Sequence, residues 1–199
     1  MKNLNETGKI LVEQFENSFA NLLANCGKSA AVLLDKITSL FPCFRDVATF
    51  QGRKVAFYKR AQILIADLWG CFEGQGFGEF EDIDSLTMFA DYLVPKGLQF
   101  MNVLEYSKEL QQSINAGELI PYGSLYEVEI RGCVIWSVEL ICDELKRLLK
   151  DEQVSKYAPP DDRVKINAIL VDFFLWDYTK KHEKEIKDFP VHKTRSIFY

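Results

Sequence analysis

Three aspartates stand in apolar or aromatic surroundings and are the residues best suited to chemistry. Asp172 and Asp177 lie within Ile166–Tyr178, where ten of the thirteen residues are apolar or aromatic, and Asp91 is flanked by aromatic residues. An ionised carboxylate is costly to bury unless it is paired or hydrogen-bonded. Each of these aspartates is therefore either a partner in a structural ion pair or a carboxylate held in an apolar pocket for acid–base or electrostatic work.

The residues around these carboxylates indicate a nucleoside or nucleotide ligand. The chain has 15 Phe, 8 Tyr and 3 Trp, and aromatic rings stack on bases. A carboxylate can accept two hydrogen bonds from a guanine-like edge, and it can stabilise an oxocarbenium-like transition state when a glycosidic bond breaks. Lys59 and Arg60 supply cations at the start of an expected helix. Asp91 can equally be a solvated turn residue or a partner of one of these cations.

The composition argues against a metal or cofactor site, against binding of polymeric nucleic acid and against membrane contact. The only histidines, His182 and His192, have no metal-ligand spacing, so we expect no metal and no organic cofactor. The net charge of −5 argues against binding of polymeric nucleic acid. Five cysteines, an odd number without a Cys-x-x-Cys pair, indicate reduced, buried thiols of an intracellular protein. No apolar run reaches membrane-spanning length and the N-terminus is no signal peptide, so we expect a cytoplasmic protein without membrane contact.

Apolar periodicity predicts a mainly helical, single domain over residues 1–199 with one short β-hairpin. Gly52 would occupy the turn of a hairpin over Val47–Tyr58. A polar loop is expected over Lys150–Arg163. Expected helices cover Thr7–Asn25, Ser29–Leu40, Lys59–Phe72, Asp84 or Ser85 to Ala90, Gly97–Leu104, Ser107–Ala116, Leu125–Lys150 and the segment from Ile166.

The helix from Ile166 has no polar face, so it should be buried nearly all round. A spacing of five residues places Asp172 and Asp177 roughly 140° apart on a helix. Either one of them reaches solvent or a structural partner, or the helix crosses a cavity that both reach. Pro95 should end the helix that precedes it near Asp91 and free the aspartate side chain.

The longest expected helix starts with a capping box formed by Ser124 and Glu127. Glu129, Arg131 and Glu139 lie along it and are most simply ion pairs or a solvated face.

Several segments, in order, resemble the queuosine salvage family, the queuosine 5'-phosphate N-glycosylases. They are Leu4-Asn-Glu-Thr-Gly-Lys, Phe57-Tyr-Lys-Arg-Ala-Gln-Ile-Leu, Thr87-Met-Phe-Ala-Asp-Tyr, Glu127-Val-Glu-Ile-Arg-Gly-Cys, Leu170-Val-Asp-Phe-Phe-Leu-Trp-Asp-Tyr and Arg195-Ser-Ile-Phe-Tyr. The resemblance implies a helical fold similar to DNA glycosylases. It also implies hydrolysis of the bond between ribose and queuine in queuosine 5'-monophosphate, which releases queuine for salvage into tRNA.

On this reading, Asp172 is the catalytic carboxylate, and it stabilises the oxocarbenium centre or positions the attacking water. Asp91 reads the base edge and Phe89 stacks on the base. Substrate contacts are also expected from Tyr92, Phe173, Asp177 and Lys59, and Lys59 or Arg60 would serve the 5'-phosphate.

The chain departs from the family pattern in two places. Family members carry a substantial segment ahead of Asn-Glu-Thr-Gly, which begins here at Asn5, and where that segment docks we expect an exposed apolar face. Phe173 stands where the family pattern has Tyr, so ring stacking would survive without a hydroxyl contact. The alternative hypothesis is a non-catalytic nucleoside- or protein-binding module derived from the family.

Overall fold

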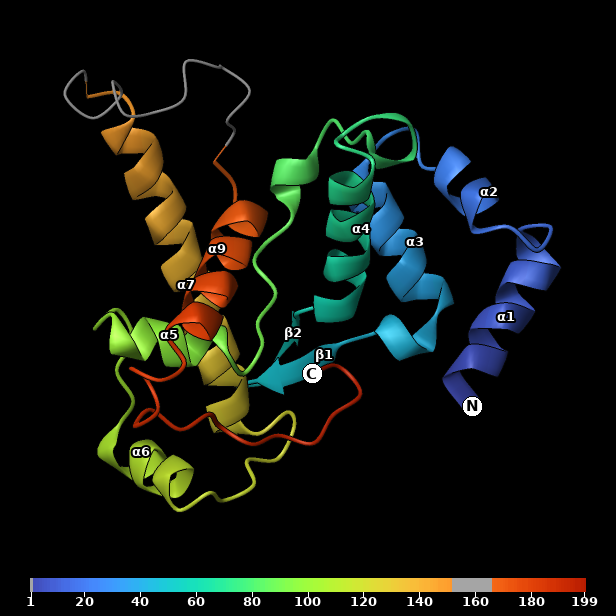
Figure 1. The fold of residues 1–199 in the computed structure, drawn as a ribbon. Coiled ribbons are helices and arrows are strands. Elements are labelled where there is room, and N and C mark those ends of the chain that lie inside the picture. Colours follow the sequence, from blue (N-terminus) through green and yellow to red (C-terminus); the bar gives the residue numbers. More distant parts are fainter. Residues whose placement is uncertain (1, 152–165) are drawn as a thin grey trace. The chain divides into compact units, whose positions relative to one another are not determined.

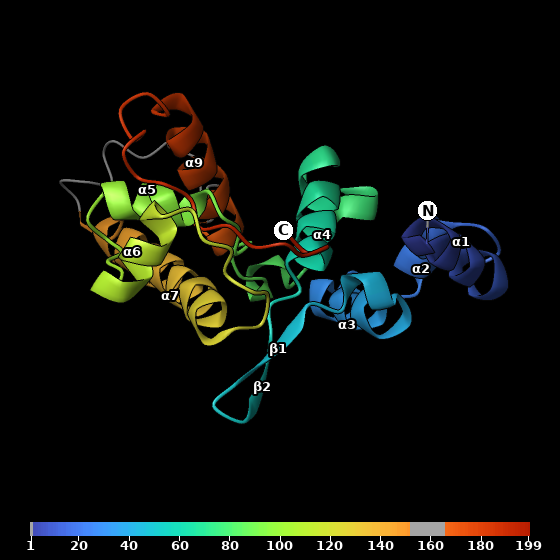
Figure 2. The ribbon, with the colours of Figure 1, turned by 90° about the horizontal axis from the view of Figure 1, so that it is seen from below.

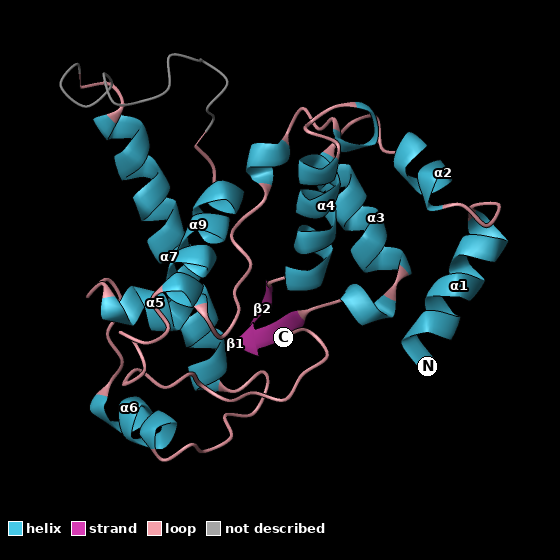
Figure 3. Cartoon of the chain, in the orientation of Figure 1, coloured by secondary structure: helices cyan, strands magenta, loops and turns pink. Residues whose placement is uncertain are grey.

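The computed structural model describes residues 2–151 and 166–199, and most of its regular structure is helical (Figure 3). The chain forms two compact units: unit 1 comprises Met1–Leu86 and Ser196–Tyr199, and unit 2 comprises Thr87–Arg195. The prediction of a mainly helical fold with one hairpin is confirmed. The single domain and the likeness to DNA glycosylases stay predictions.

Unit 1 is built around the packing of helices α3 and α4 (Figure 1). Ser29 caps α3, because its hydroxyl accepts a hydrogen bond from the Val32 amide at 3.1 Å. Leu33 and Ile65 are fully buried in this core. The helices of the unit are α1 (Lys2–Gln14), α2 (Phe19–Ala24), α3 (Ala30–Leu40) and α4 (Lys59–Cys71), with 3-10 turns η1 (Pro42–Phe44), η2 (Gly76–Gly78) and η3 (Ile83–Ser85).

The predicted hairpin is present in unit 1 (Figure 2). Strands β1 (Val47–Phe50) and β2 (Arg53–Ala56) pair antiparallel. The two turn residues, Gln51 and Gly52, both have positive φ, at 48° and 76°. That conformation matches the twist of two-residue hairpins, and glycine adopts it at low cost.

The prediction of a single helix over Thr7–Asn25 is wrong, because the helical structure is interrupted between α1 and α2. Glu16 and Asn17 have φ of 52° and 63°, a conformation that ends a helix. Ser18 then takes an extended conformation at the start of α2. At this break, Asn21 Nδ2 donates to the Phe15 carbonyl at 3.1 Å, a contact that apolar spacing does not reveal.

In unit 2, helices α5 (Val94–Phe100), α7 (Leu125–Leu148) and α9 (Ala168–Lys181) pack on one another, and α6 (Lys108–Asn115) follows α5 (Figures 1 and 2). Gly97 permits the close approach of α5 to α9, because a Cβ there would collide with Thr179 Oγ1. The core includes Leu98, Val134, Val138 and Leu175.

The helix predicted to end at Ala90 is wrong. Only the turn η3 forms, and Thr87–Leu93 contains no helix. The segment is a short apolar run whose residues Met88, Phe89 and Ala90 are all buried, and periodicity cannot separate such a run from a helix. The helix predicted over Gly97–Leu104 begins earlier, at Val94, with Pro95 in the first turn, where its missing N–H costs nothing.

Helix α7 starts with half of the predicted capping box. The Ser124 hydroxyl accepts from the Glu127 amide at 3.5 Å, whereas Glu127 Oε2 accepts from the Gly123 amide at 3.0 Å. Arg131 does not lie on a solvated face: it is fully buried and forms an ion pair of 3.4 Å with the buried Glu127. The predicted polar loop lies outside the described residues except for its first two positions.

The composition of helix α9 predicted burial nearly all round, and this prediction is wrong. Leu170, Phe173, Phe174 and Trp176 are exposed, with Phe174 at 63%. A hydrophobic composition therefore did not require a fully buried helix. No helix among residues 2–151 and 166–199 is both long and apolar enough to cross a bilayer.

Candidate active site

Asp172 lies on the buried side of α9 and joins that helix to the extended segment before α5. Asn167 starts α9, because its side-chain oxygen accepts from the Leu170 amide at 3.0 Å. One turn later, the Asp172 side chain is only 5% exposed. Its Oδ1 accepts a hydrogen bond from the Phe89 amide at 3.1 Å. A buried carboxylate with such a donor is fixed in position.

Phe89 and Phe173 place two aromatic rings beside this carboxylate. The ring centroids are 6.0 Å apart with an interplanar angle of 54°. Phe89 is buried, whereas Phe173 is 40% exposed. The pair therefore extends from the buried carboxylate toward the surface, which suits a planar ligand that stacks on an exposed ring.

Asp91 serves a structural purpose that the sequence did not predict. Its Oδ1 accepts from the amides of Leu93 and Val94, both at 2.9 Å, and so caps α5. The expectation that Pro95 ends a helix and frees this side chain is wrong: the proline lies in the first turn of the helix that Asp91 caps. The neighbouring Tyr92 is exposed.

Asp177 lies on the outer side of α9, as the predicted angle between the two aspartates requires. Its side chain is 62% exposed and its Oδ2 lies 4.0 Å from Lys181 Nζ. Of the two alternatives that the sequence left open, the structure shows the one in which one aspartate reaches solvent. Asp177 follows Phe173 by four residues, so both lie on one face of the helix.

The same outer face carries two residues that the sequence analysis did not single out, Trp176 and Lys180. Lys180 Nζ lies 5.4 Å from the Trp176 ring centroid, which is a cation–π contact. Their spacing of three and seven residues from Phe173 is the helical signal that would have found them.

Lys59 belongs to unit 1, where its backbone amide donates to Asp46 Oδ2 at 3.1 Å at the start of α4. The next cation, Arg60, is engaged locally: its Nη1 donates to the carbonyls of Cys43 and Ile197, both at 3.3 Å. Its guanidinium also lies 5.1 Å from the Phe44 ring centroid. Local contacts therefore hold the Arg60 side chain in place.

The cysteines are only partly as predicted, since Cys71 and Cys133 are exposed while the other three are buried. Within residues 2–151 and 166–199, no group of three or more His, Cys, Asp or Glu side chains could hold a metal ion. The candidate site of unit 2 thus combines a fixed carboxylate, an aromatic pair and an outer carboxylate.

Known proteins resemble the whole of this chain. A family profile described as "Queuosine salvage protein" matches residues 1–199. Two similar proteins are named "Queuosine 5'-phosphate N-glycosylase/hydrolase". The protein from Nematostella vectensis is 50% identical over 199 residues, which are 100% of this chain and 57% of the relative. The protein from Mus musculus is 50% identical over 196 residues, which are 98% of this chain and 56% of the relative. The protein of that name from Sphaerobacter thermophilus matches with 43% identity over 196 residues (98% and 56%). The chain thus spans a little over half the length of these relatives. It belongs to the queuosine salvage protein family.

Proposed function

We propose that this protein acts as a queuosine 5'-phosphate N-glycosylase/hydrolase. The reaction would break the bond between ribose C1' and the queuine nitrogen, with water supplying a hydroxyl to C1' and a proton to the base. The observation that carries the proposal is the buried Asp172, fixed by the Phe89 amide beside an aromatic pair, in a chain that matches the family over its whole length.

Asp172 is the proposed catalytic carboxylate. Its negative charge would stabilise the cation that develops at C1', or it would position the attacking water. Asp172→Asn keeps the shape of the side chain and removes the charge. We expect this change to lower the rate of base release by roughly 10²–10³, the typical effect of one lost electrostatic contact in a transition state.

The test is a queuine-release assay on this chain with queuosine 5'-monophosphate, beside a nucleotide-binding measurement. Nucleotide binding by Asp172→Asn should stay within about tenfold of wild type. Asp143→Asn is the matched control, because this aspartate is exposed on α7. Near-normal turnover of Asp172→Asn would remove Asp172 from the role and make Asp177 the next candidate.

The substrate contacts are proposed as follows. Phe89 and Phe173 stack against the base, Tyr92 and Asp177 complete its enclosure, and Asp91 accepts hydrogen bonds from the guanine-like edge. Because Asp91 Oδ1 already caps α5, the base would share this carboxylate with the first turn of the helix. Asp91→Ala should then weaken binding of free queuine and of the nucleotide by a similar factor.

Lys59 is proposed to bind the 5'-phosphate. Lys59→Ala should raise KM for the nucleotide and leave inhibition by free queuine unchanged, because the free base has no phosphate. We further propose a cytoplasmic location, which would make the released queuine available for tRNA modification, and a reaction without metal or organic cofactor.

A second candidate function is a non-catalytic nucleoside- or protein-binding module. Exposed apolar side chains that follow one another along α9, Leu170, Phe173 and Phe174, favour this alternative, because contiguous exposed apolar patches mark interaction surfaces. The two candidates differ in the assay: a binding module would bind nucleotide or a protein partner and release no queuine.

A further inference from the structure

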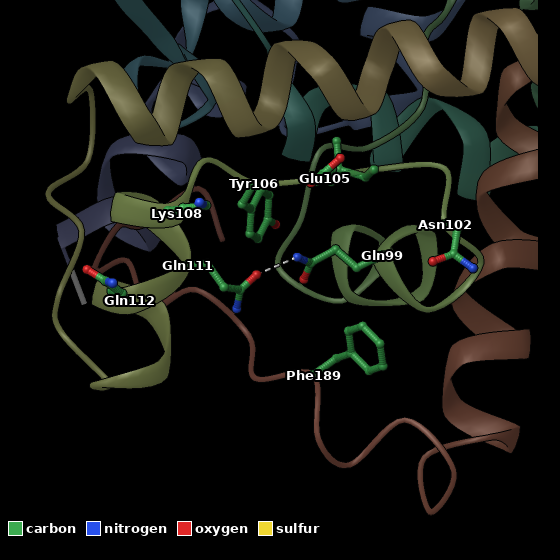
Figure 4. A pocket seen from close by; sticks show the side chains of 9 residues that line it. Gln99, Asn102, Glu105, Tyr106, Lys108, Gln111, Gln112 and Phe189 are labelled. Carbon is green, nitrogen blue, oxygen red and sulfur yellow. Dashed lines mark hydrogen bonds between the residues drawn. The ribbon is translucent and has the colours of Figure 1, made fainter.

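Unit 2 contains a pocket that shares no lining residue with the candidate active site (Figure 4). It lies between α5, α6 and the chain that follows α9, and its volume is about 660 Å³. That volume suits a small molecule. Amide and aromatic side chains dominate its wall, among them those of Gln99, Asn102, Tyr106, Gln111, Gln112 and Phe189.

The Gln99 side chain leaves one acceptor in this pocket without a partner. Its Nε2 donates to Gln111 Oε1 at 2.9 Å (Figure 4). Gln111 Nε2 donates in turn to Asn115 Oδ1 at 2.9 Å. In this series of amides, the oxygen of Gln99 is the end that does not contact Gln111. Gln99 is only 7% exposed, and no residue in the described part of the chain donates to its Oε1. Buried polar atoms of this kind are normally hydrogen-bonded, so the site calls for a donor.

The charges around the pocket favour a neutral ligand. Lys108 and Glu105 are both exposed at its wall and carry opposite charges. Burial raises the pKa of Tyr106, with a further contribution from Cys133, so the phenol stays neutral. Amides and a phenol offer donors and acceptors without net charge.

Two aromatic rings, those of Tyr106 and Phe189, border this amide-lined space. Phe189 packs edge-on against Phe100, with ring centroids 6.0 Å apart and an interplanar angle of 86°, so the ring is held in place. A sugar ring presents hydroxyl donors and acceptors at its edge and C–H groups on its face. That combination matches an array of amides beside aromatic rings.

We propose that this pocket binds a neutral, hydroxyl-rich molecule of monosaccharide size, and that a shift of a neighbouring side chain opens the fully buried Gln99 Oε1 to a ligand hydroxyl that donates to it. The inference does not rest on the proposed glycosylase activity. The site would hold a sugar or polyol separately from the carboxylates of α9, and Asp172 would have no part in it.

The test is a titration of the ¹⁵N-labelled chain with D-ribose and with D-glucose, followed through the side-chain amide resonances. At least one sugar should shift the Gln99 and Gln111 amide signals with saturation. Gln99→Leu keeps the approximate size and removes the acceptor. It should weaken binding between about threefold and tenfold, the factor that one hydrogen bond supplies.

Two further variants keep the test interpretable. Gln112→Leu changes an exposed residue of the pocket wall and should also weaken binding of the sugar. This variant keeps the proposal testable if Gln99→Leu fails to fold. Gln14→Leu is the matched control, because this glutamine is exposed at the end of α1, and it should leave binding unchanged.

Three outcomes would overturn the proposal. The first is that neither sugar shifts the pocket amides at concentrations that saturate a millimolar site, which would mean that the pocket holds only water. The second is a stronger response to acetate or methylammonium than to the sugars, which would contradict a neutral ligand. The third is undiminished sugar binding in both pocket variants.

Discussion

The interior and the exterior of unit 2 each contain side chains that are uncommon in such a place: charged groups lie within a mainly apolar core, and large aromatic groups lie at the surface. Glu127 and Arg131 are fully buried, and Asp172 is 5% exposed, whereas Phe174 and Trp136 are 63% and 64% exposed. The interior groups make hydrogen bonds that position backbone or one another. In this unit, buried polar contacts fix the start of α7 and join α9 to the segment before α5, while the aromatic side chains at the surface are available for contact.

The largest expected effect comes from the buried ion pair on α7. Glu127→Ala leaves the fully buried Arg131 without this partner and removes the acceptor of the Gly123 amide. We expect the free energy of unfolding to fall by about 3–5 kcal/mol, as measured by chemical denaturation.

The control uses the same residue type on the same helix. Glu144 is exposed and bonded to Arg147, and Glu144→Ala should change the stability far less. Equal losses at the two positions would contradict the view that the interior charges matter more than the exterior ones.

The next effect depends on pH and concerns His192, which is 3% exposed. Burial, with a smaller contribution from Arg131, lowers the pKa of His192 to about 4 from 6.5. Between these values the unfolded chain binds more protons than the folded one, so the free energy of unfolding falls as the pH falls. The loss over this window is about 3 kcal/mol.

Denaturation at several pH values checks this prediction. His192→Gln, which cannot titrate, should flatten the pH dependence of stability between pH 6.5 and pH 4. An identical slope in wild type and variant would show that the histidine is not responsible for it.

A smaller effect on stability separates the two aspartates of α9. Asp172→Ala removes the acceptor of the Phe89 amide and should cost about 1–3 kcal/mol. Asp177→Ala removes only an exposed contact of 4.0 Å to Lys181 and should stay within about 0.5 kcal/mol of wild type. Denaturation curves of the two variants in one buffer make the comparison, and the reverse order would contradict it.

Sequence patterns predicted the element types well where a helix has caps or a hairpin has a turn. Ser29 and Ser107 mark the starts of α3 and α6, and Gly52 marks the hairpin turn. The patterns failed at Thr87–Leu93, because a short buried run has the same composition as a buried helix. There, a contact distant in sequence, from the Phe89 amide to Asp172, helps to hold a backbone that the local sequence does not determine.

The candidate site was predictable in its residue types and only partly in its geometry. The helical angle between Asp172 and Asp177 correctly required different surroundings for the two carboxylates. The same reasoning gave the wrong local structure for Asp91, because it treated Pro95 as the end of one helix rather than the start of the next. Neither the burial of Arg131 nor the exposure of Phe174 follows from periodicity, since both depend on which helix faces pack together.

A small expected effect on stability concerns the exposed aromatic side chains of unit 2. Trp176 and Trp136 are 43% and 64% exposed on α9 and α7. Because much of each ring already contacts water, replacing it with alanine removes less buried surface than the truncation of a core side chain of that size would. We expect each change to lower the free energy of unfolding by about 1 kcal/mol, in denaturation experiments followed by circular dichroism.

The matched control for Trp176→Ala is Leu175→Ala, one position earlier on α9. Leu175 is 3% exposed in the core of unit 2, so its truncation leaves a cavity and should cost about 2–5 kcal/mol. Truncation of the smaller Leu175 would then lower the free energy of unfolding more than truncation of the larger Trp176, because Leu175 points into the core and Trp176 points outward. If Trp176→Ala were as destabilising as Leu175→Ala, the outer face of α9 would be part of the core, and its aromatic side chains would not be available for a ligand or a partner.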